Sequence, residues 1–185
     1  MIFFSGYEYE GDFLKENYMN LKDEKKLYFT SKKNYIRCCL LKEHEYYLWR
    51  FQKLLRKEER SHNFIIKSYF RFRKNVLGRK LGLTIPAGVF DEGLHIWHYG
   101  SVVVNATARV GKNCKLHGGN VIGNNGRTLS APHIGDNVDI GAGAIIIGDV
   151  TIADGVKIGA GAVVVSSCME AGSTLVGVPA RKVNK

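Results

Sequence analysis

Two histidines flank a tryptophan in the segment GLHIWHYG, residues 93–100. Imidazole titrates near neutral pH, so a histidine at this place could act as a general base and take a proton from an attacking hydroxyl. The rings of Trp97 and Tyr99 each combine an apolar face with a polar edge, which suits contact with a sugar. The segment therefore places a candidate general base, His98, beside aromatic rings that could contact the acceptor. His95 is interpreted as structural.

The chain after this segment repeats with a period of six. From residue 104 onward, ten of eleven hexads begin with Val, Ile or Leu, and only the hexad at Thr128 does not. These leading residues are Val104, Val110, Leu116, Ile122, Ile134, Ile140, Ile146, Ile152, Ile158 and Val164. Such a period predicts a parallel β-helix, in which a coil of about 18 residues rises by about 4.8 Å and each leader points into the core.

The fifth place of most hexads is also small or aliphatic, and it holds Cys114 and Cys168. No pair of the four cysteines has CxxC spacing, so buried thiols are expected in place of a disulfide or a metal site. The segment NNGRTLSAPH, residues 124–133, breaks the repeat with turn-forming residues, and we expect it to project on a binding face. Arg127 at its tip is a candidate contact for an anionic acceptor, or a solvated charge.

Charge divides the chain into two regions. Residues 1–80 hold 19 of the 27 Lys and Arg residues but only 10 of the 17 Asp and Glu residues. We predict a basic helical region at 1–80, with helices over 34–59 and 62–80, and a β-helix domain at 81–185. The helices would cap the β-helix. Their charge has three interpretations: solvated faces, attraction to an anionic membrane surface, or nucleic-acid binding, the last of which is not expected.

No basic leader with a long apolar run precedes the helices, and no apolar stretch approaches 18 residues. We therefore expect a cytoplasmic protein, with peripheral contact at the inner face of the membrane as a further interpretation.

The repeats, with IGAGA at 140–144 and 158–162 and GVPARKV at 177–183, resemble the left-handed β-helix acyltransferases. Residues 83–183 are similar to the serine acetyltransferases and more similar to the acetyltransferases of colanic-acid and capsule synthesis, in HYGSVVVN and APHIGDNVDIGAGAIIIGDVT. The resemblance implies a mainly β fold, a left-handed parallel β-helix with an N-terminal α-helical cap. It also implies a homotrimer that uses acetyl-CoA as co-substrate, without a metal.

His98 aligns with the catalytic histidine of that family, which implies that it is the general base. Counted back from Val104, His98 also takes a leader position in the first coil, where an unpaired imidazole costs about 1–3 kcal/mol unless it caps the open end. The family has an aspartate directly before this histidine and a second one that orients it. Trp97 and Leu83 stand at those places.

A further departure concerns the Arg-His pair with which serine acetyltransferases hold the amino acid, because Ser130 and Ala131 replace it here. A free amino acid needs charges to meet its carboxylate and ammonium groups. Trp97 and Tyr99 therefore favour a sugar hydroxyl, although ordinary packing also explains Trp97. Stacking by 18 residues places Leu116 over His98 and His117 over Tyr99. His117 and His133 are further acceptor candidates, or ordinary surface histidines.

The resemblance also implies a coenzyme A groove along the stacked IGAGA repeats, where small residues let an extended pantetheine arm reach backbone amides. The residues carried over to this groove are Gly141, Ala142, Gly159 and Ala160, with Arg181 and Lys182 as phosphate contacts.

The sequence thus predicts an O-acetyltransferase that acts on a sugar hydroxyl in surface polysaccharide synthesis. A serine O-acetyltransferase of cysteine synthesis is the alternative. A β-helix that serves only as a scaffold is the non-enzymatic hypothesis.

Overall fold

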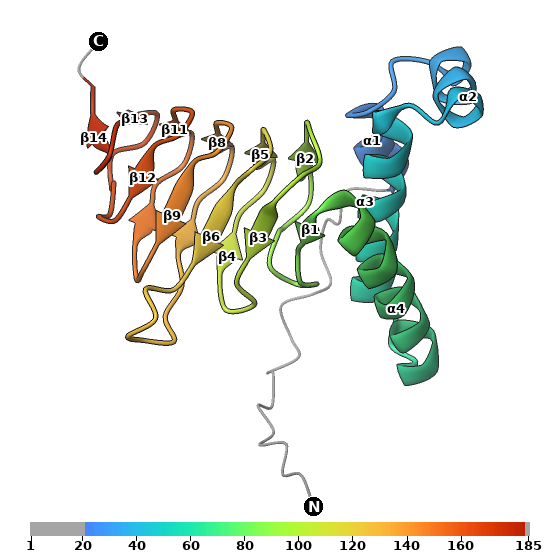
Figure 1. The fold of residues 1–185 in the computed structure, drawn as a ribbon, viewed down its shortest axis with the longest axis horizontal. Coiled ribbons are helices and arrows are strands. Elements are labelled where there is room, and N and C mark those ends of the chain that lie inside the picture. Colours follow the sequence, from blue (N-terminus) through green and yellow to red (C-terminus); the bar gives the residue numbers. More distant parts are fainter. Residues whose placement is uncertain (1–20, 184–185) are drawn as a thin grey trace, which may run out of the picture.

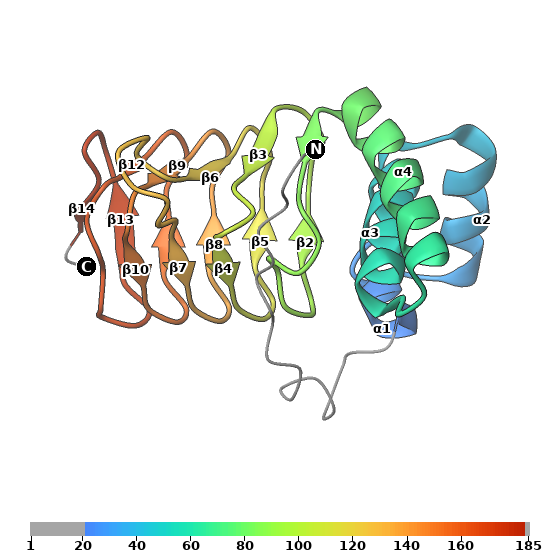
Figure 2. The ribbon, with the colours of Figure 1, turned by 90° about the horizontal axis from the view of Figure 1, so that it is seen from below.

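The computed structural model describes residues 21–183, which form a group of helices at one end of a stack of short strands (Figure 1). The helices are α1 (Leu21–Lys26), α2 (Lys32–Leu41), α3 (His44–Arg60) and α4 (Phe64–Leu81). The strands climb away from the helices in successive coils, as Figure 2 also shows. The predicted helical cap on a parallel β-helix is confirmed. Residues 1–20 of the predicted N-terminal region lie outside the described residues.

The strands form three sheets, which we name A, B and C. Sheet A contains β1 (Leu83–Thr84), β3 (Val102–Val104), β6 (Val121–Gly123), β9 (Ile145–Ile147) and β12 (Val163–Val164). Sheet B contains β4 (Arg109–Val110), β7 (His133–Ile134) and β10 (Thr151–Ile152). Sheet C contains β2 (His95–Ile96), β5 (Lys115–Leu116), β8 (Asp139–Ile140), β11 (Lys157–Ile158), β13 (Thr174–Val176) and β14 (Arg181–Lys182).

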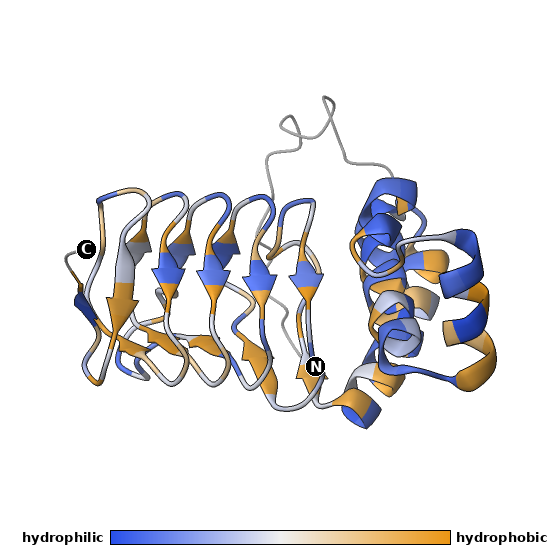
Figure 3. Cartoon of the chain, turned by 90° about the horizontal axis from the view of Figure 1, so that it is seen from above, coloured by the Kyte–Doolittle hydropathy of each residue, from blue (hydrophilic) through white to orange (hydrophobic). Residues whose placement is uncertain are grey.

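The leaders of the hexads form the core, as the repeat predicts. None of the ten is more than 4% exposed, and they stack in parallel register, for example Leu116 on Ile140 and Ile140 on Ile158. Cys114 is fully buried beneath them, whereas Cys168 is half-buried. In Figure 3 the strands along one face begin with hydrophilic residues and end with hydrophobic ones, which is the outward and inward alternation of a strand.

The first coil departs from the repeat. Ile96 is fully buried and pairs with Leu116, so Ile96 occupies the inward position and His98 is an exposed residue of the turn that follows. The prediction of His98 as a leader, with Leu116 over it and His117 over Tyr99, is therefore wrong. The turn before β3 is two residues longer than a hexad allows, and Gly100 accommodates it with a φ of 116°.

The segment that breaks the repeat leaves the stack between β6 and β7, and it projects below the coils in Figure 1. Its residues 125–130 are exposed, and the Asn125 side chain accepts hydrogen bonds from the backbone N–H groups of Arg127 and Thr128. The predicted projection is confirmed. Because the loop leaves and returns at one turn, the coils on either side keep their pairing, Val110 with Ile134 and Ile134 with Ile152.

The helical region contains one break that the sequence prediction missed. Residues 34–59 are not one helix, since α2 ends before Lys42, which adopts the left-handed conformation with a φ of 56°. The prediction for 62–80 is close to α4, whose Asn63 side chain caps the first turn and whose Gly82 ends the helix at a positive φ. Among the described residues, no helix is long and apolar enough to cross a membrane.

A buried ion pair fastens the helices to the first coil. Arg56 of α3 contacts Glu24 of α1 at 3.0 Å, and both side chains are almost fully buried. Arg56 also donates to the backbone carbonyls of Phe90 and Asp91, while Glu24 accepts from the Gly93 N–H group at 3.0 Å. Because these backbone groups lie on the open edge of the coil stack, the pair satisfies hydrogen bonds that a further coil would otherwise make.

Arg56→Ala should lower the free energy of unfolding by about 3–5 kcal/mol, because it leaves the Glu24 carboxylate buried and unpaired. Lys26→Ala, which removes the exposed pair with Asp23, is the matched control and should cost less than about 1 kcal/mol. Urea unfolding of both variants measures the difference. Equal small effects would mean that the buried pair does not hold the cap in place.

His95 lies at the same junction. Its ring meets Tyr28 of the cap edge-on, with centroids 5.1 Å apart, and the indole of Trp97 at 4.5 Å. Burial, together with the nearby charges of Lys115 and His117, lowers the pKa of His95 from 6.5 to about 4.

The unfolded chain therefore binds a proton at His95 before the folded chain does. The stability that neutral His95 contributes is complete above pH 6.5 and is lost as the pH falls towards 4. His95→Gln should consequently show a weaker fall of the unfolding free energy between pH 6.5 and 4 than the wild type, measured by denaturant unfolding at several pH values. Identical pH profiles would contradict the assignment.

Candidate active site

The candidate site runs along one edge of the prism, where each coil turns from sheet C into sheet A. We call this edge the C/A corner; it consists of residues 97–101, 117–120, 141–144 and 159–162. Backbone hydrogen bonds join each turn to the next, from Trp97 to Leu116, from His117 to Ile140 and from Gly141 to Ile158. Residues far apart in the sequence therefore lie one coil apart along the corner, at roughly 4.8 Å per coil.

His98 stands at the end of the corner that meets the helical cap. Its ring stacks on His44, the first residue of α3, with centroids 5.7 Å apart and planes 26° apart. Its Cβ packs against the backbone of Gly118 in the next coil, where any side chain would come within 3.3 Å. Sequence reasoning missed His44, because helical spacing says nothing about which coil residue a helix will meet.

The two carboxylates nearest in sequence to His98, Asp91 and Glu92, have other surroundings. Glu92 pairs with Lys112 at 3.1 Å, and Asp91 lies in the cavity on sheet B. Leu83, at the place where the family has an orienting aspartate, is buried in the core.

Next to His98, aromatic rings form a short stack. The ring centroids of Trp97 and His117 lie 5.7 Å apart, and the two planes are only 10° from parallel. His117 Nε2 is 2.7 Å from Asp139 Oδ1. Trp97 and Tyr99 are 44% and 47% exposed, so both can contact a ligand. His117 is therefore a neighbour of Trp97 and not of Tyr99, and the sequence did not reveal its partner Asp139.

Further along the corner, small residues replace the rings. Gly141 and Gly159 stack as the repeat predicts, and a Cβ on Gly141 would lie 2.6 Å from the Ala160 nitrogen, too close for any side chain. Ala142 and Ala160 are exposed beside them. The corner thus presents a strip of backbone without large side chains, to which an extended amide-bearing chain could bind.

The C-terminal basic pair lies beyond this strip. The chain returns over the corner with an Ala180 N–H bond to Val163 and forms β14, which pairs antiparallel with β13. Arg181 is exposed and donates a hydrogen bond to the Ala180 carbonyl. Lys182 is paired with Glu170 at 2.5 Å, so Arg181 is the better candidate for binding a phosphate.

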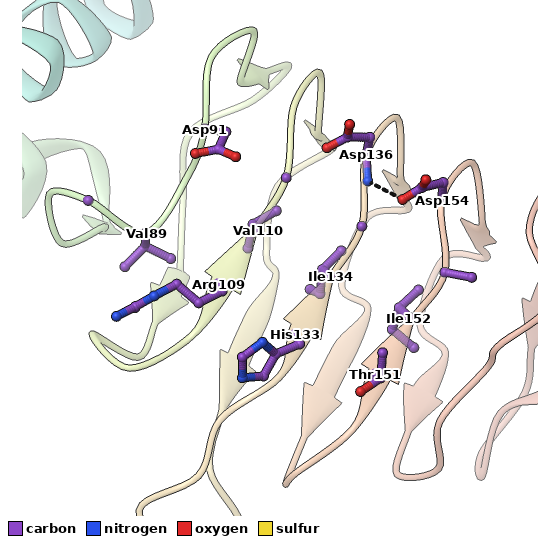
Figure 4. Close-up of a pocket in the computed structure, with 14 residues that line it drawn as sticks. Val89, Asp91, Arg109, Val110, His133, Ile134, Asp136, Thr151, Ile152 and Asp154 are labelled. Carbon is purple, nitrogen blue, oxygen red and sulfur yellow. Dashed lines mark hydrogen bonds between the residues drawn. The ribbon is translucent and has the colours of Figure 1, made fainter. Parts of the chain in front are cut away.

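Two predicted acceptor residues lie elsewhere. His133 is in sheet B, the face opposite the C/A corner, where it lines a shallow cavity of about 460 Å³ with Arg109, Asp136 and Asp154 (Figure 4). Arg127 is in the loop between sheets A and B. Within one chain, therefore, the structure does not bring either residue together with His98.

The described residues contain one cluster of three potential metal ligands, Cys38, Glu43 and Glu45, with ligand atoms within 4.8 Å of one another. Burial and a hydrogen bond to Glu43 raise the pKa of the Cys38 thiol, which disfavours the thiolate that a metal requires. The expectation of a metal-free enzyme stays a prediction.

Comparison with known proteins agrees with this architecture. Residues 131–166 match the family model of the bacterial transferase hexapeptide (six repeats). A serine acetyltransferase of Staphylococcus xylosus is 34% identical over 134 residues, which cover 66% of this chain and 62% of that protein. The putative colanic acid biosynthesis acetyltransferase WcaB of Escherichia coli is 40% identical over 67 residues, 36% of this chain and 41% of that protein.

A solved serine acetyltransferase in complex with CoA superimposes with a TM-score of 0.62 and 25% identity, over 74% of this chain and 57% of that one. The chain therefore spans less than two thirds of the length of each of these proteins. The sequence comparisons and the structural superposition both agree with the repeat, the parallel coils and the helical cap described above. This chain is thus a hexapeptide-repeat protein with a left-handed parallel β-helix, similar to the serine acetyltransferases.

Proposed function

We propose that the protein is an acetyl-CoA-dependent O-acetyltransferase. The observation that carries the proposal is the C/A corner, which has an exposed imidazole, His98, at one end and a strip of small residues at the other. Acyl transfer to a hydroxyl requires a base at the attacking oxygen and a place for the thioester arm. Both requirements are met along a single edge of the molecule.

In this proposal His98 is the general base. Its exposed ring can receive the acceptor hydroxyl, and the contact with His44 limits the directions in which the ring can turn. As the hydroxyl oxygen attacks the thioester carbon, its proton passes to His98.

The strip at Gly141, Ala142, Gly159 and Ala160 would hold the pantetheine arm, and Arg181 would meet the phosphates. The complex of a related serine acetyltransferase with CoA supports this donor. One chain provides one wall of the strip, so we propose that a second copy in a homotrimer provides the other.

For the acceptor, the relatives favour L-serine, because serine acetyltransferases match the chain over more of its length than the colanic acid enzyme does. L-Serine is therefore the first acceptor we propose.

A sugar hydroxyl is the second candidate, and one feature of the site favours it. The exposed ring of Trp97 stands where the serine enzymes carry a charge, and it is held parallel to His117 as a flat surface. Ser130 and Ala131, which replace the Arg-His pair, bring no charge to meet an amino acid.

The test is the release of free CoA thiol from acetyl-CoA, with L-serine and a panel of sugars and surface oligosaccharides as acceptors. His98→Ala should lower kcat by about 10²–10⁴-fold with the productive acceptor, because it removes the base. Turnover with a saccharide alone would select the second candidate. A wild-type protein that turns over no acceptor, and that CoA does not stabilise against heat, would support the scaffold hypothesis.

Ala160→Trp should raise the KM for acetyl-CoA at least about tenfold, which corresponds to a loss of about 1.4 kcal/mol of binding. The indole would occupy the strip, while the exposed position should leave the melting temperature unchanged. Asp149→Trp, an exposed residue in the turn between sheets A and B, is the matched control and should leave the KM unchanged. Equal KM values for both variants would remove the strip from the donor site.

A further inference from the structure

A hydrogen-bonded imidazole–carboxylate pair, His117 and Asp139, lies beside the C/A corner and has no catalytic role in the function proposed above. His117 Nε2 and Asp139 Oδ1 are 2.7 Å apart, and both side chains are about one-third exposed, at 36% and 33%. A carboxylate on one ring nitrogen fixes the orientation of the ring. It leaves Nδ1 as the nitrogen that can exchange a proton with a ligand.

The position of His117 relative to the strip suggests what that ligand would be. Leu116 pairs with Ile140, Ile140 with Ile158 and Ile158 with Leu175. The residues that follow these leaders therefore form a column of His117, Gly141, Gly159 and Val176. Since the glycines bring no side chain, His117 is the imidazole at which the strip of small residues ends.

Contacts on the other side keep His117 in place. Trp97 lies parallel to the imidazole at 5.7 Å, and Gly118, the next residue, packs against the backbone of His98. His98 and His117 thus belong to adjacent coils of the corner, but their imidazoles face different neighbours. His98 meets the helical cap through His44, whereas His117 adjoins the glycine strip.

We propose that His117, oriented by Asp139, is the general acid that protonates the thiol leaving group of the acetyl donor. The inference rests on the proposed acetyl transfer. When the acceptor oxygen bonds to the thioester carbon, the hydroxyl proton goes to His98. When the carbon–sulfur bond breaks, its electron pair stays on sulfur, and the sulfur takes a proton from Nδ1 of the His117 imidazolium. His98 then releases its proton to water and His117 regains one from water, so the cycle balances.

The test compares two donors that differ in their leaving group: acetyl-CoA, whose alkyl thiolate needs a proton, and an acetyl aryl thioester, whose more acidic thiol leaves without one. His117→Gln should lower the rate with acetyl-CoA by about 10²-fold or more and the rate with the aryl thioester by only a small factor. His98→Ala should slow both donors equally. Asp139→Asn should act in the same direction as His117→Gln by a smaller factor, because the imidazole remains but loses the carboxylate that orients it.

Lys157→Met is the matched control. Lys157 lies opposite Asp139 in the register of the neighbouring strand β11, and it has no assigned role. It should leave both rates at the wild-type level. An equal loss with both donors for His117→Gln, or no loss with either, would overturn the assignment while acetyl transfer itself stands. If the wild type transfers acetyl to no acceptor, the proposed function fails and this inference fails with it. Melting temperatures of all variants show whether they fold. If His117→Gln does not fold, Asp139→Asn provides the second test.

Discussion

Backbone hydrogen bonding at the open end of the coil stack is the constraint on which the rest of this molecule depends. A parallel coil satisfies its N–H and C=O groups only through the coils above and below it, so the first coil must find partners elsewhere. The Glu24–Arg56 pair supplies them for one edge, and Lys74 reaches the Ile85 carbonyl at 3.1 Å on another. By closing this end, the helical cap also brings α3 to the first turn of the C/A corner, where it meets His98.

In the candidate site, the residues that pack the core and the residues that could contact a ligand occupy different positions of the repeat. Inward leaders such as Ile140 and Ile158 are confined to aliphatic residues by the core, while the residue after each leader differs from coil to coil. At the C/A corner that residue is an indole, then an imidazole, then two glycines. The same backbone geometry therefore carries an aromatic surface, an acid–base group and a smooth strip in succession, without any change in the core beneath them.

Sequence reasoning predicted the parts of the molecule that depend on a regular period. Ten leaders, the stacked glycines and the projecting loop could be found because each coil repeats the same burial requirement. The position of His98 could not be obtained by counting back from Val104, because a two-residue extension before β3 shifts every residue upstream of it. The break at Lys42 depends on one backbone conformation, and the contacts of His44 and Asp139 join elements that no local pattern relates.

Because strands pair directly on strands, positions along the corner can differ only by whole strand spacings. Every turn along it is displaced from the next by one hydrogen-bonded step of roughly 4.8 Å, and the core does not tolerate intermediate values. The separation along the corner between His117 and Gly159 is therefore a whole number of coils. A chain of this kind would adapt to a donor of different length by gaining or losing a complete coil, because stretching the existing ones would break the ladder that holds them.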